Sequence, residues 1–505
     1  MVVLVGSLNC LGEAFNPFEF LSSANLEGTE LLQSAAEGLT WEAFAATCGE
    51  RLLSDTATAM PTGGADALAR LREHCNGGHT LWSFFDEPTL EKDNKLLEGR
   101  LNLLQFAMRG HGDADEPQWL LLERWVDEMA ALVETHASQT YASDPNLWLW
   151  DLTCNSVASA ELAAFQAICQ SSYLNPSNFQ RNGERLVGAA LEAADAAEHG
   201  TPLVLGMQEW PRGETLKGRA FAAAATEREL RIVVGAESVA CLHSAALGEA
   251  AVLDTSVDVT KAVLQQCLDA AAAAGAPPLE AKATAGLENA CRKLLAVRFP
   301  AAPPAVAANI FLVSHPKEPK SEAAAHMLAD VLLAIGRRAA ETAGVPPANL
   351  VVLADTNCGS TAMAAAFAAR LAASGFDAQP PPEIPTTAKQ RSILHGQCYD
   401  TAKCLKLVVA PKDKIITTTG LSGVGVVPNV AAFQGTALPS DDWPADHALI
   451  YARLVVGGTG GDGVVVGGTG GDGAVEPTGA DAAAEPKDAP SEGGAKKASA
   501  ACAVL

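Results

Sequence analysis

Residues 349–358 read NLVVLADTNC, and this stretch indicates the fold of the chain. Val351, Val352 and Leu353 form an apolar run of the kind found in a strand buried on both faces. Asp355 and Asn357 follow it at once. Strand ends and the loops after them are where a rigid scaffold presents reactive side chains. The stretch therefore predicts a buried strand that delivers a carboxylate and an amide together.

Further apolar runs alternate with segments of helical periodicity along the rest of the chain. Because the strands are numerous and their connections irregular, the pattern favours a mixed, layered α/β domain over a simple parallel sheet. Residues 26–140 carry apolar residues at three-and-four spacing, which predicts a helical insertion after the first strand. Strands are predicted at 2–9, 147–155, 201–210, 230–236, 294–299, 309–315, 404–410, 414–419 and 447–456, and helices at 321–343 and 360–374.

The composition divides the chain near residue 455. The 505 residues are 48% hydrophobic and 19% charged, as expected for a globular protein with a large core. VVGGTGGDG then occurs at 455–463 and again at 465–473, and Ala, Gly, Pro and acidic residues follow. Such a segment cannot bury a core. We therefore expect a folded domain at 1–455 and a disordered tail at 456–505.

The net charge of −24 argues against binding of long duplex DNA, which usually requires a basic face. The twelve cysteines include no CxxC pair, and the first residues, MVVLVGSLNC, have no basic region before the apolar run. No uncharged apolar run approaches the ~20 residues that span a bilayer. These features predict a cytoplasmic protein with reduced thiols.

Polar residues end or follow most of the predicted strands. Each one taken singly is usually a turn, cap or structural residue. As a set, carboxylates with amides and histidines suit a hard cation such as Mg²⁺, which prefers oxygen ligands and can neutralise a phosphate. Histidines nearby can donate to phosphate oxygens or act as acid or base. The set is Asn9, Glu209, His315, Asp355, Asn357, Asp413, Asp446 and His447.

In its order along the chain, this set resembles the endonuclease/exonuclease/phosphatase superfamily, which has the deoxyribonuclease-I-like fold. Each motif is weak alone, but six in the same order are fairly specific. The resemblance covers residues 1–455 except for the helical insertion. The matching elements are GSLN, GMQEW, FLVSH, LADTN, PKDKII and PADH.

The resemblance implies a four-layer α/β/β/α sandwich of two packed mixed sheets and a Mg²⁺ cofactor, with Mn²⁺ as the alternative ion. It also implies a role for each residue of the set. Asn9, Glu209 and Asp446 would serve the metal site, with Asp446 alternatively supporting a histidine; Asp355 would orient or deprotonate water; Asn357, His315 and His447 would contact phosphate; and Asp413 would orient His447.

Several positions depart from the family pattern. Ala354 and Ala445 replace the Gly and Ser that precede the two aspartates, and Pro316 follows His315. No reacting group is lost. The PAWCDR signature of the inositol-phosphatase subgroup is absent, so the subgroup stays open. Residues 386–403 look like a loop of uncharacterised algal and protist members, in which Lys389 and Arg391 either reach substrate phosphate or are simply solvated.

The chain ends Cys502-Ala503-Val504-Leu505, which fits a prenylation motif with Leu favouring geranylgeranylation. We therefore expect a membrane surface and a prenyltransferase among the partners of this protein. The leading hypothesis is a Mg²⁺-dependent phosphoesterase at the cytoplasmic face of a membrane, acting on a phospholipid headgroup, an inositol phosphate or a small phosphodiester. A metal-dependent nuclease and a catalytically inactive scaffold are the alternatives.

Overall fold

The structure is a computed structural model of the 505-residue chain, and it describes most of residues 2–455. Arg391 and Cys502, together with the predicted tail, lie outside the described residues. The described ranges are 2–11, 26–48, 61–86, 145–171, 175–197, 200–213, 215–390, 407–418, 420–430, 438–440 and 443–455.

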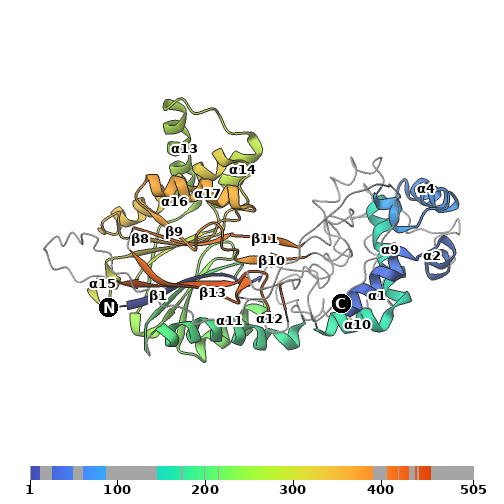
Figure 1. The fold of residues 1–505 in the computed structure, drawn as a ribbon, viewed down its shortest axis with the longest axis horizontal. Coiled ribbons are helices and arrows are strands. Elements are labelled where there is room, and N and C mark those ends of the chain that lie inside the picture. The colour runs from blue at the N-terminus through green and yellow to red at the C-terminus, as the bar shows by residue number, and fades with distance from the viewer. Residues whose placement is uncertain are drawn as a thin grey trace, which may run out of the picture. The chain divides into compact units, whose positions relative to one another are not determined.

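Two six-stranded mixed sheets form the centre of the fold (Figure 1). Only β1–β2 and β7–β8 pair in parallel; all other neighbours within the two sheets are antiparallel. The first sheet has the order β13 (Leu421–Val427), β14 (Leu449–Val455), β1 (Val2–Asn9), β2 (Leu203–Gln208), β4 (Ala240–Ser244) and β3 (Leu230–Val234). The second has the order β5 (Ala251–Leu253), β6 (Leu294–Arg298), β7 (Ile310–Ser314), β8 (Leu350–Asp355), β12 (Asp413–Thr417) and β9 (Asp377–Gln379).

Each sheet is apolar on both faces, and the alternation along β8 shows why. Val351 and Leu353 pack between the two sheets, whereas Val352 and Ala354 pack against helices. The helices on the outer face of the second sheet are α13 (Val257–Ala273), α14 (Ala281–Ala290), α16 (Glu322–Thr342) and α17 (Thr361–Ala373). Those on the outer face of the first sheet are α11 (Pro176–Ala197) and α12 (Leu216–Thr226).

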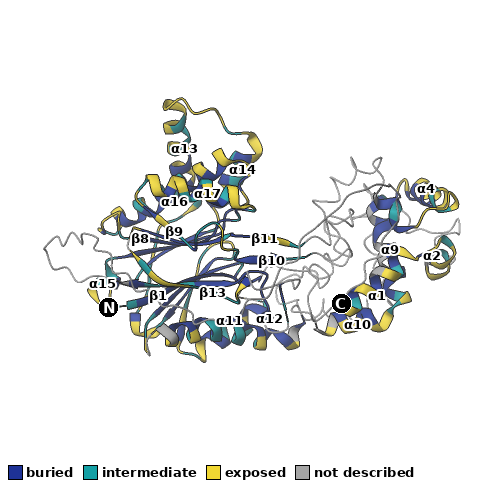
Figure 2. Ribbon diagram, viewed as in Figure 1, coloured by how far each residue is buried: buried dark blue, intermediate teal, exposed yellow. Residues whose placement is uncertain are grey.

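These layers confirm the predicted α/β/β/α sandwich. In Figure 2 the strands between the helical layers are buried, and the exposed residues of α16 and α17 face away from the sheet. Shorter elements complete the connections: η2 (Ala245–Leu247), α15 (Pro304–Ala307), and a separate antiparallel pair of β10 (Thr387–Lys389) and β11 (Val408–Ala410). None of the helices in the described ranges combines the length and apolarity needed to cross a membrane.

Every regular element that the structure describes between β1 and β2 is a helix, and the strand predicted at 147–155 is wrong. That stretch lies inside α9, which begins at Pro145, a residue that suits the first turn of a helix. Buried Trp148, Leu149 and Trp150 make it apolar on several faces, so its pattern resembles that of a buried strand. The helices here are α1 (Leu26–Glu37), α2 (Trp41–Cys48), α4 (Gly64–Asn76), η1 (Trp82–Asp86), α9 (Pro145–Ala160) and α10 (Leu162–Ser171).

The two sheets approach each other closely where β2 crosses β8. A Cβ atom on Gly206 would lie 2.6 Å from the Cβ of Leu353. Two residues later, the buried Gln208 side chain donates from Nε2 to the carbonyl oxygen of Leu353 at 3.1 Å. The glycine and this hydrogen bond together bring the ends of β2 and β8 side by side, which places Glu209 beside Asp355.

Candidate active site

The sheet topology gathers the polar strand ends at one edge of the sandwich. β1 and β2 run parallel with Asn9 opposite Gln208, so Asn9 and Glu209 emerge together. In the second sheet, Asp413 at the start of β12 pairs with Asp355 at the end of β8, because these strands are antiparallel. Residues from both sheets therefore meet without any long loop.

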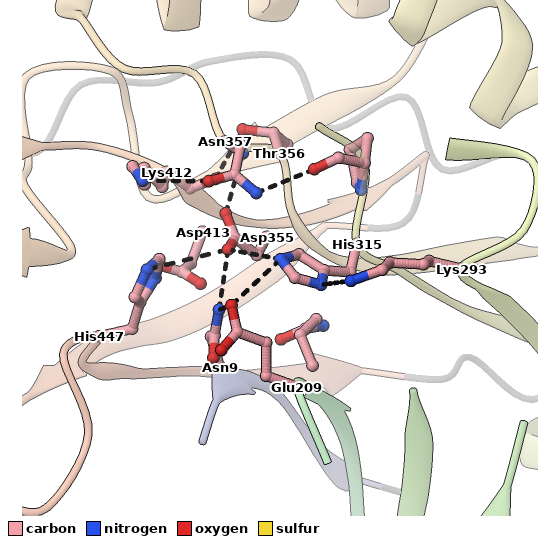
Figure 3. Close-up of polar contacts among 12 residues, drawn as sticks. Asn9, Glu209, Lys293, His315, Asp355, Thr356, Asn357, Lys412, Asp413 and His447 are labelled. Atoms are coloured by element: carbon pink, nitrogen blue, oxygen red, sulfur yellow. Dashed lines mark hydrogen bonds and ion pairs between the residues drawn. The ribbon is translucent and has the colours of Figure 1, made fainter. Parts of the chain in front are cut away.

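Asp355 lies at the centre of the group, with His315 and His447 on opposite sides (Figure 3). Asn9 donates from Nδ2 to Asp355 Oδ2 and to Glu209 Oε1, both at 3.1 Å. His315 Nε2 lies 3.5 Å from Asp355 Oδ2 and 3.6 Å from Glu209 Oε1. The Asp355 side chain is fully buried, whereas that of Glu209 is 22% exposed, so the group opens to solvent at Glu209.

The electrostatic surroundings keep Asp355 ionised. Burial alone would raise the pKa of this carboxyl, but the positive charges of His447, His315 and Lys412 bring its pKa down to about 2. The backbone N–H of Asn357 also donates to Asp355 Oδ1 at 2.8 Å. A carboxylate with such a low pKa is a weak base, so its suited task is to orient a water molecule.

His447 is held by a buried hydrogen-bond chain. Its Nδ1 lies 2.8 Å from Asp413 Oδ2, and the hydroxyl of Thr386 donates to the same oxygen at 2.6 Å. Burial would lower the pKa of His447, but Asp413, Asp446 and Asp355 raise it to about 9. A protonated imidazole with Nδ1 engaged presents Nε2–H as a donor, which suits contact with a phosphate oxygen.

His315 is oriented by a lysine that the sequence analysis did not single out. Lys293 Nζ lies 3.5 Å from His315 Nδ1, and an ammonium group can only donate. When His315 is neutral, Nδ1 must therefore accept, and Nε2 carries the proton that faces Glu209 and Asp355. The ring then faces these carboxylates with an N–H group, at distances longer than an ordinary hydrogen bond.

Two of the site residues have a left-handed backbone. Glu209 and Asn357 both have φ of 51°, a conformation that non-glycine residues rarely adopt and that costs on the order of 1–3 kcal/mol. Asn357 is fastened by its side chain, which donates from Nδ2 to the carbonyl of Pro316 at 2.8 Å and accepts at Oδ1 from Lys412 at 3.0 Å. Such backbone strain at two residues of one site is typical of functional positions.

Asp446 forms an ion pair with Lys389. Lys389 donates from Nζ to Asp446 Oδ2 at 2.8 Å, and His447 Nε2 lies 3.8 Å from the same oxygen. Burial would raise the pKa of Asp446, but Lys389 and then His447 hold its pKa well below its usual range. The hydroxyl of Thr387 donates to the backbone carbonyl of Asp446 at 2.6 Å, which fixes this loop.

The donor set fits a metal ion. Asp355, Asp413 and His447 each bring one ligand atom within 4.8 Å of the others. The buried oxygens Asp413 Oδ1 and Asp446 Oδ1 have no hydrogen-bond partner among the described residues, although buried polar atoms are normally paired. Glu209 and Asn9 add oxygen donors beside Asp355. The oxygen donors of this group can therefore hold a metal ion, whereas a protonated His447 cannot be a ligand and faces the site as a hydrogen-bond donor. The unpaired carboxylate oxygens indicate that the site can accept a further ligand.

All eight residues of the predicted set are described, and each makes a polar contact with another member of the set or with a residue bonded to one. The roles assigned to them by the resemblance stay predictions. Lys293 was missed because no motif surrounds it. Lys412 lies within PKDKII and Thr386 within the stretch 386–403, but neither was singled out, because only the fold brings their side chains to the site.

Comparisons with known proteins give structural matches. No protein-family model matches the chain, and no curated protein is detectably similar in sequence. One similar structure is an endonuclease/exonuclease/phosphatase from Bacteroides vulgatus, with 14% identity, a TM-score of 0.31, and coverage of 57% of this chain and 94% of that chain. Another is ANGEL2, a 2',3'-cyclic phosphatase in complex with adenosine-2',3'-vanadate, with 9% identity, a TM-score of 0.29, and coverage of 54% and 86%.

Proposed function

We propose that this protein is a metal-dependent phosphoesterase. The observation that supports it best is the buried, ionised Asp355 between two histidines, next to a partly exposed Glu209. This arrangement combines oxygen donors for a cation with imidazole N–H groups for an anion. Phosphoester hydrolysis needs both, because charge develops on the phosphoryl oxygens as water attacks.

Each side chain then has a task that follows from its contacts. Asp355 accepts a hydrogen bond from the attacking water and orients it. Protonated His447, held by Asp413, donates from Nε2 to a phosphoryl oxygen. Asn9 keeps Asp355 and Glu209 side by side by donating to both.

The proposed cofactor is Mg²⁺, with Mn²⁺ as an alternative, since both favour oxygen donors. Glu209, Asn9 and Asp355 are the residues that would hold it, with Asp446 as a further carboxylate. When bound, the ion would neutralise negative charge on the phosphate.

The proposed substrate is a phosphorylated small molecule or lipid headgroup. The chain carries a net charge of −24, and an acidic protein repels the long polyanion of duplex DNA more strongly than a small phosphate ester. Inositol phosphates, phospholipid headgroups and small phosphodiesters all belong to this class. A nuclease acting on short or single-stranded substrates is the second enzymatic candidate.

The test is hydrolysis of a panel of phosphomonoesters, phosphodiesters, phospholipid vesicles and oligonucleotides, with Mg²⁺, Mn²⁺ or EDTA. We expect metal-dependent release of product, and a loss of about 10²–10⁴-fold in the Glu209→Gln and Asp355→Asn variants. Asp330→Asn and Glu341→Gln, which change acids on helix α16 that are not part of the site set, serve as matched controls. Absence of turnover on the whole panel would overturn the proposal in favour of an inactive scaffold, and preference for oligonucleotides would favour the nuclease.

A further inference from the structure

Lys389 and Asp446 form a shielded ion pair at the edge of the site. Lys389 Nζ lies 2.8 Å from Asp446 Oδ2, and the two side chains are 18% and 4% exposed. Lys389 is two residues from Thr387 on β10, so both side chains leave the same face of the strand. Thr387 bonds the backbone of Asp446 and Lys389 bonds its carboxylate, so β10 grips Asp446 at two points.

These contacts engage only one of the two oxygens of the Asp446 carboxylate. Asp446 Oδ1 is buried and has no hydrogen-bond partner among the described residues, although a polar atom removed from water is normally paired. The oxygen is thus ready to accept a cation or another donor. Because Lys389 holds the other oxygen, any cation that approaches Asp446 meets the charge of Lys389.

A second lysine lies close to the pair. Lys412 is anchored to Asn357 Oδ1 at 3.0 Å, and the pKa of Lys412 is lowered by burial and then by the charge of Lys389. The charges of Asp355, Asp446 and Asp413 partly offset this repulsion, so a cation that neutralised Asp446 would increase the affinity of the two ammonium groups for another anion. Asn357 and His447, the residues suited to contact phosphate, border the same region.

We propose that Lys389 is an internal counter-ion, which occupies Asp446 in the metal-free protein, competes with the divalent ion for that carboxylate, and contacts the substrate phosphate once the ion has displaced it. This inference rests on the proposed metal-dependent function. It assigns Lys389 two opposite effects: its charge weakens metal binding and strengthens phosphate binding. A lysine that merely stabilises the fold would have neither effect.

The experiment is calorimetric titration of Mn²⁺ into EDTA-stripped, dialysed protein, followed by titration of inorganic phosphate into the Mn²⁺-loaded protein. In Lys389→Met, which keeps the length of the stem but removes the charge, we expect Mn²⁺ to bind about tenfold tighter and phosphate about tenfold weaker, a coupling of ordinary size. Lys261→Met, at an exposed position of α13, makes the same chemical change and should alter neither affinity.

Unchanged or weaker Mn²⁺ binding in Lys389→Met would overturn the inference, as would unchanged phosphate binding. Thermal unfolding in EDTA checks that the variant is folded; if it is not, Lys389→Gln keeps a neutral donor toward Asp446 and is used in its place. Tighter Mn²⁺ binding together with no hydrolysis of any phosphoester would overturn the proposed function alone. Metal-dependent hydrolysis with unaltered Mn²⁺ affinity in the variant would overturn only the role of Lys389.

Discussion

A hydrogen bond of 2.8 Å between His447 and Asp413 decides the charge on one side of the site. Without Asp413, burial would favour the neutral imidazole, because it disfavours a charge removed from water. With Asp413, and with Asp446 and Asp355 nearby, His447 is protonated at neutral pH. The family resemblance implied that His447 contacts phosphate. Its positive charge gives this expectation a physical basis, because a protonated imidazole can donate a hydrogen bond to an anion.

The first prediction concerns Asp413→Asn. We expect the pKa of His447 to fall by more than one unit from about 9, because the charge of its nearest partner is removed. We also expect the hydrolysis rate to fall about 10²-fold, the lower end of what a positioned acid or base contributes. An NMR titration of the imidazole measures the first effect independently of activity. Asp330→Asn is the control, and an unshifted pKa would refute the assignment.

The pKa of His447 also predicts how the stability of the metal-free protein depends on pH. The folded pKa of about 9 lies above the ordinary value of 6.5, so the stabilisation is complete below pH 6.5 and is lost as the pH rises through 9. The difference in free energy of unfolding between wild type and His447→Gln, measured by urea denaturation in EDTA, should shrink across this range. A difference that stays constant from one end to the other would contradict the prediction.

At the scale of elements, the site depends on how closely β2 crosses β8. Gly206 has no room for a side chain, because its Cβ would lie 2.6 Å from Leu353 Cβ. Glu209 follows three residues later, so any separation of the two sheets at Gly206 moves Glu209 away from Asp355. In the sequence, Gly206 belongs to the apolar stretch 201–210 and begins the element GMQEW, and neither pattern shows that it faces another sheet.

We therefore predict that Gly206→Ala lowers both the stability of the protein and its affinity for a metal ion. Overpacking of this kind costs about 1–3 kcal/mol of stability, measured by chemical denaturation. It should also weaken Mn²⁺ binding, since Asn9 can no longer bridge Glu209 and Asp355. Gly188→Ala, in the interior of α11 with nothing within 4 Å of the added methyl, should instead stabilise the protein by about 0.5–1 kcal/mol. Equal stability and equal Mn²⁺ affinity in the two variants would contradict the role of the close contact between β2 and β8.

The predicted bounds of several helices and strands agree closely with the observed ones. Strand β1 was predicted with its observed bounds, and the helices at 321–343 and 360–374 differ from α16 and α17 by one residue at each end. The stretch 147–155 was assigned to the wrong class because a short apolar run suits a buried strand and a buried helix equally. Residues 87–144, which include much of the predicted insertion, lie outside the described residues.

At the scale of the whole molecule, the site is a cluster of buried carboxylates that a cation should stabilise. Adding Mg²⁺ at about 100 times its dissociation constant should raise the free energy of unfolding by about 2.7 kcal/mol, because the ion binds only the folded chain. Differential scanning calorimetry with Mg²⁺ and with EDTA measures the change. In Glu209→Gln the metal-dependent increase should be much smaller, while the midpoint in EDTA stays close to that of wild type. An identical increase in both proteins would place the ion elsewhere.

The sequence alone determined the layered α/β class, the positions of nine of the described strands and of helices α16 and α17, and the eight polar residues at the strand ends. It could do so because burial imposes an apolar pattern on each element, and because polar residues that end strands stand out against it. Only the tertiary structure decided which of these residues touch, that Asp446 pairs with Lys389, and that Lys293, Thr386 and Lys412 support the site. Contacts between residues tens to hundreds of positions apart depend on sheet order and register, and no local pattern along the chain encodes them.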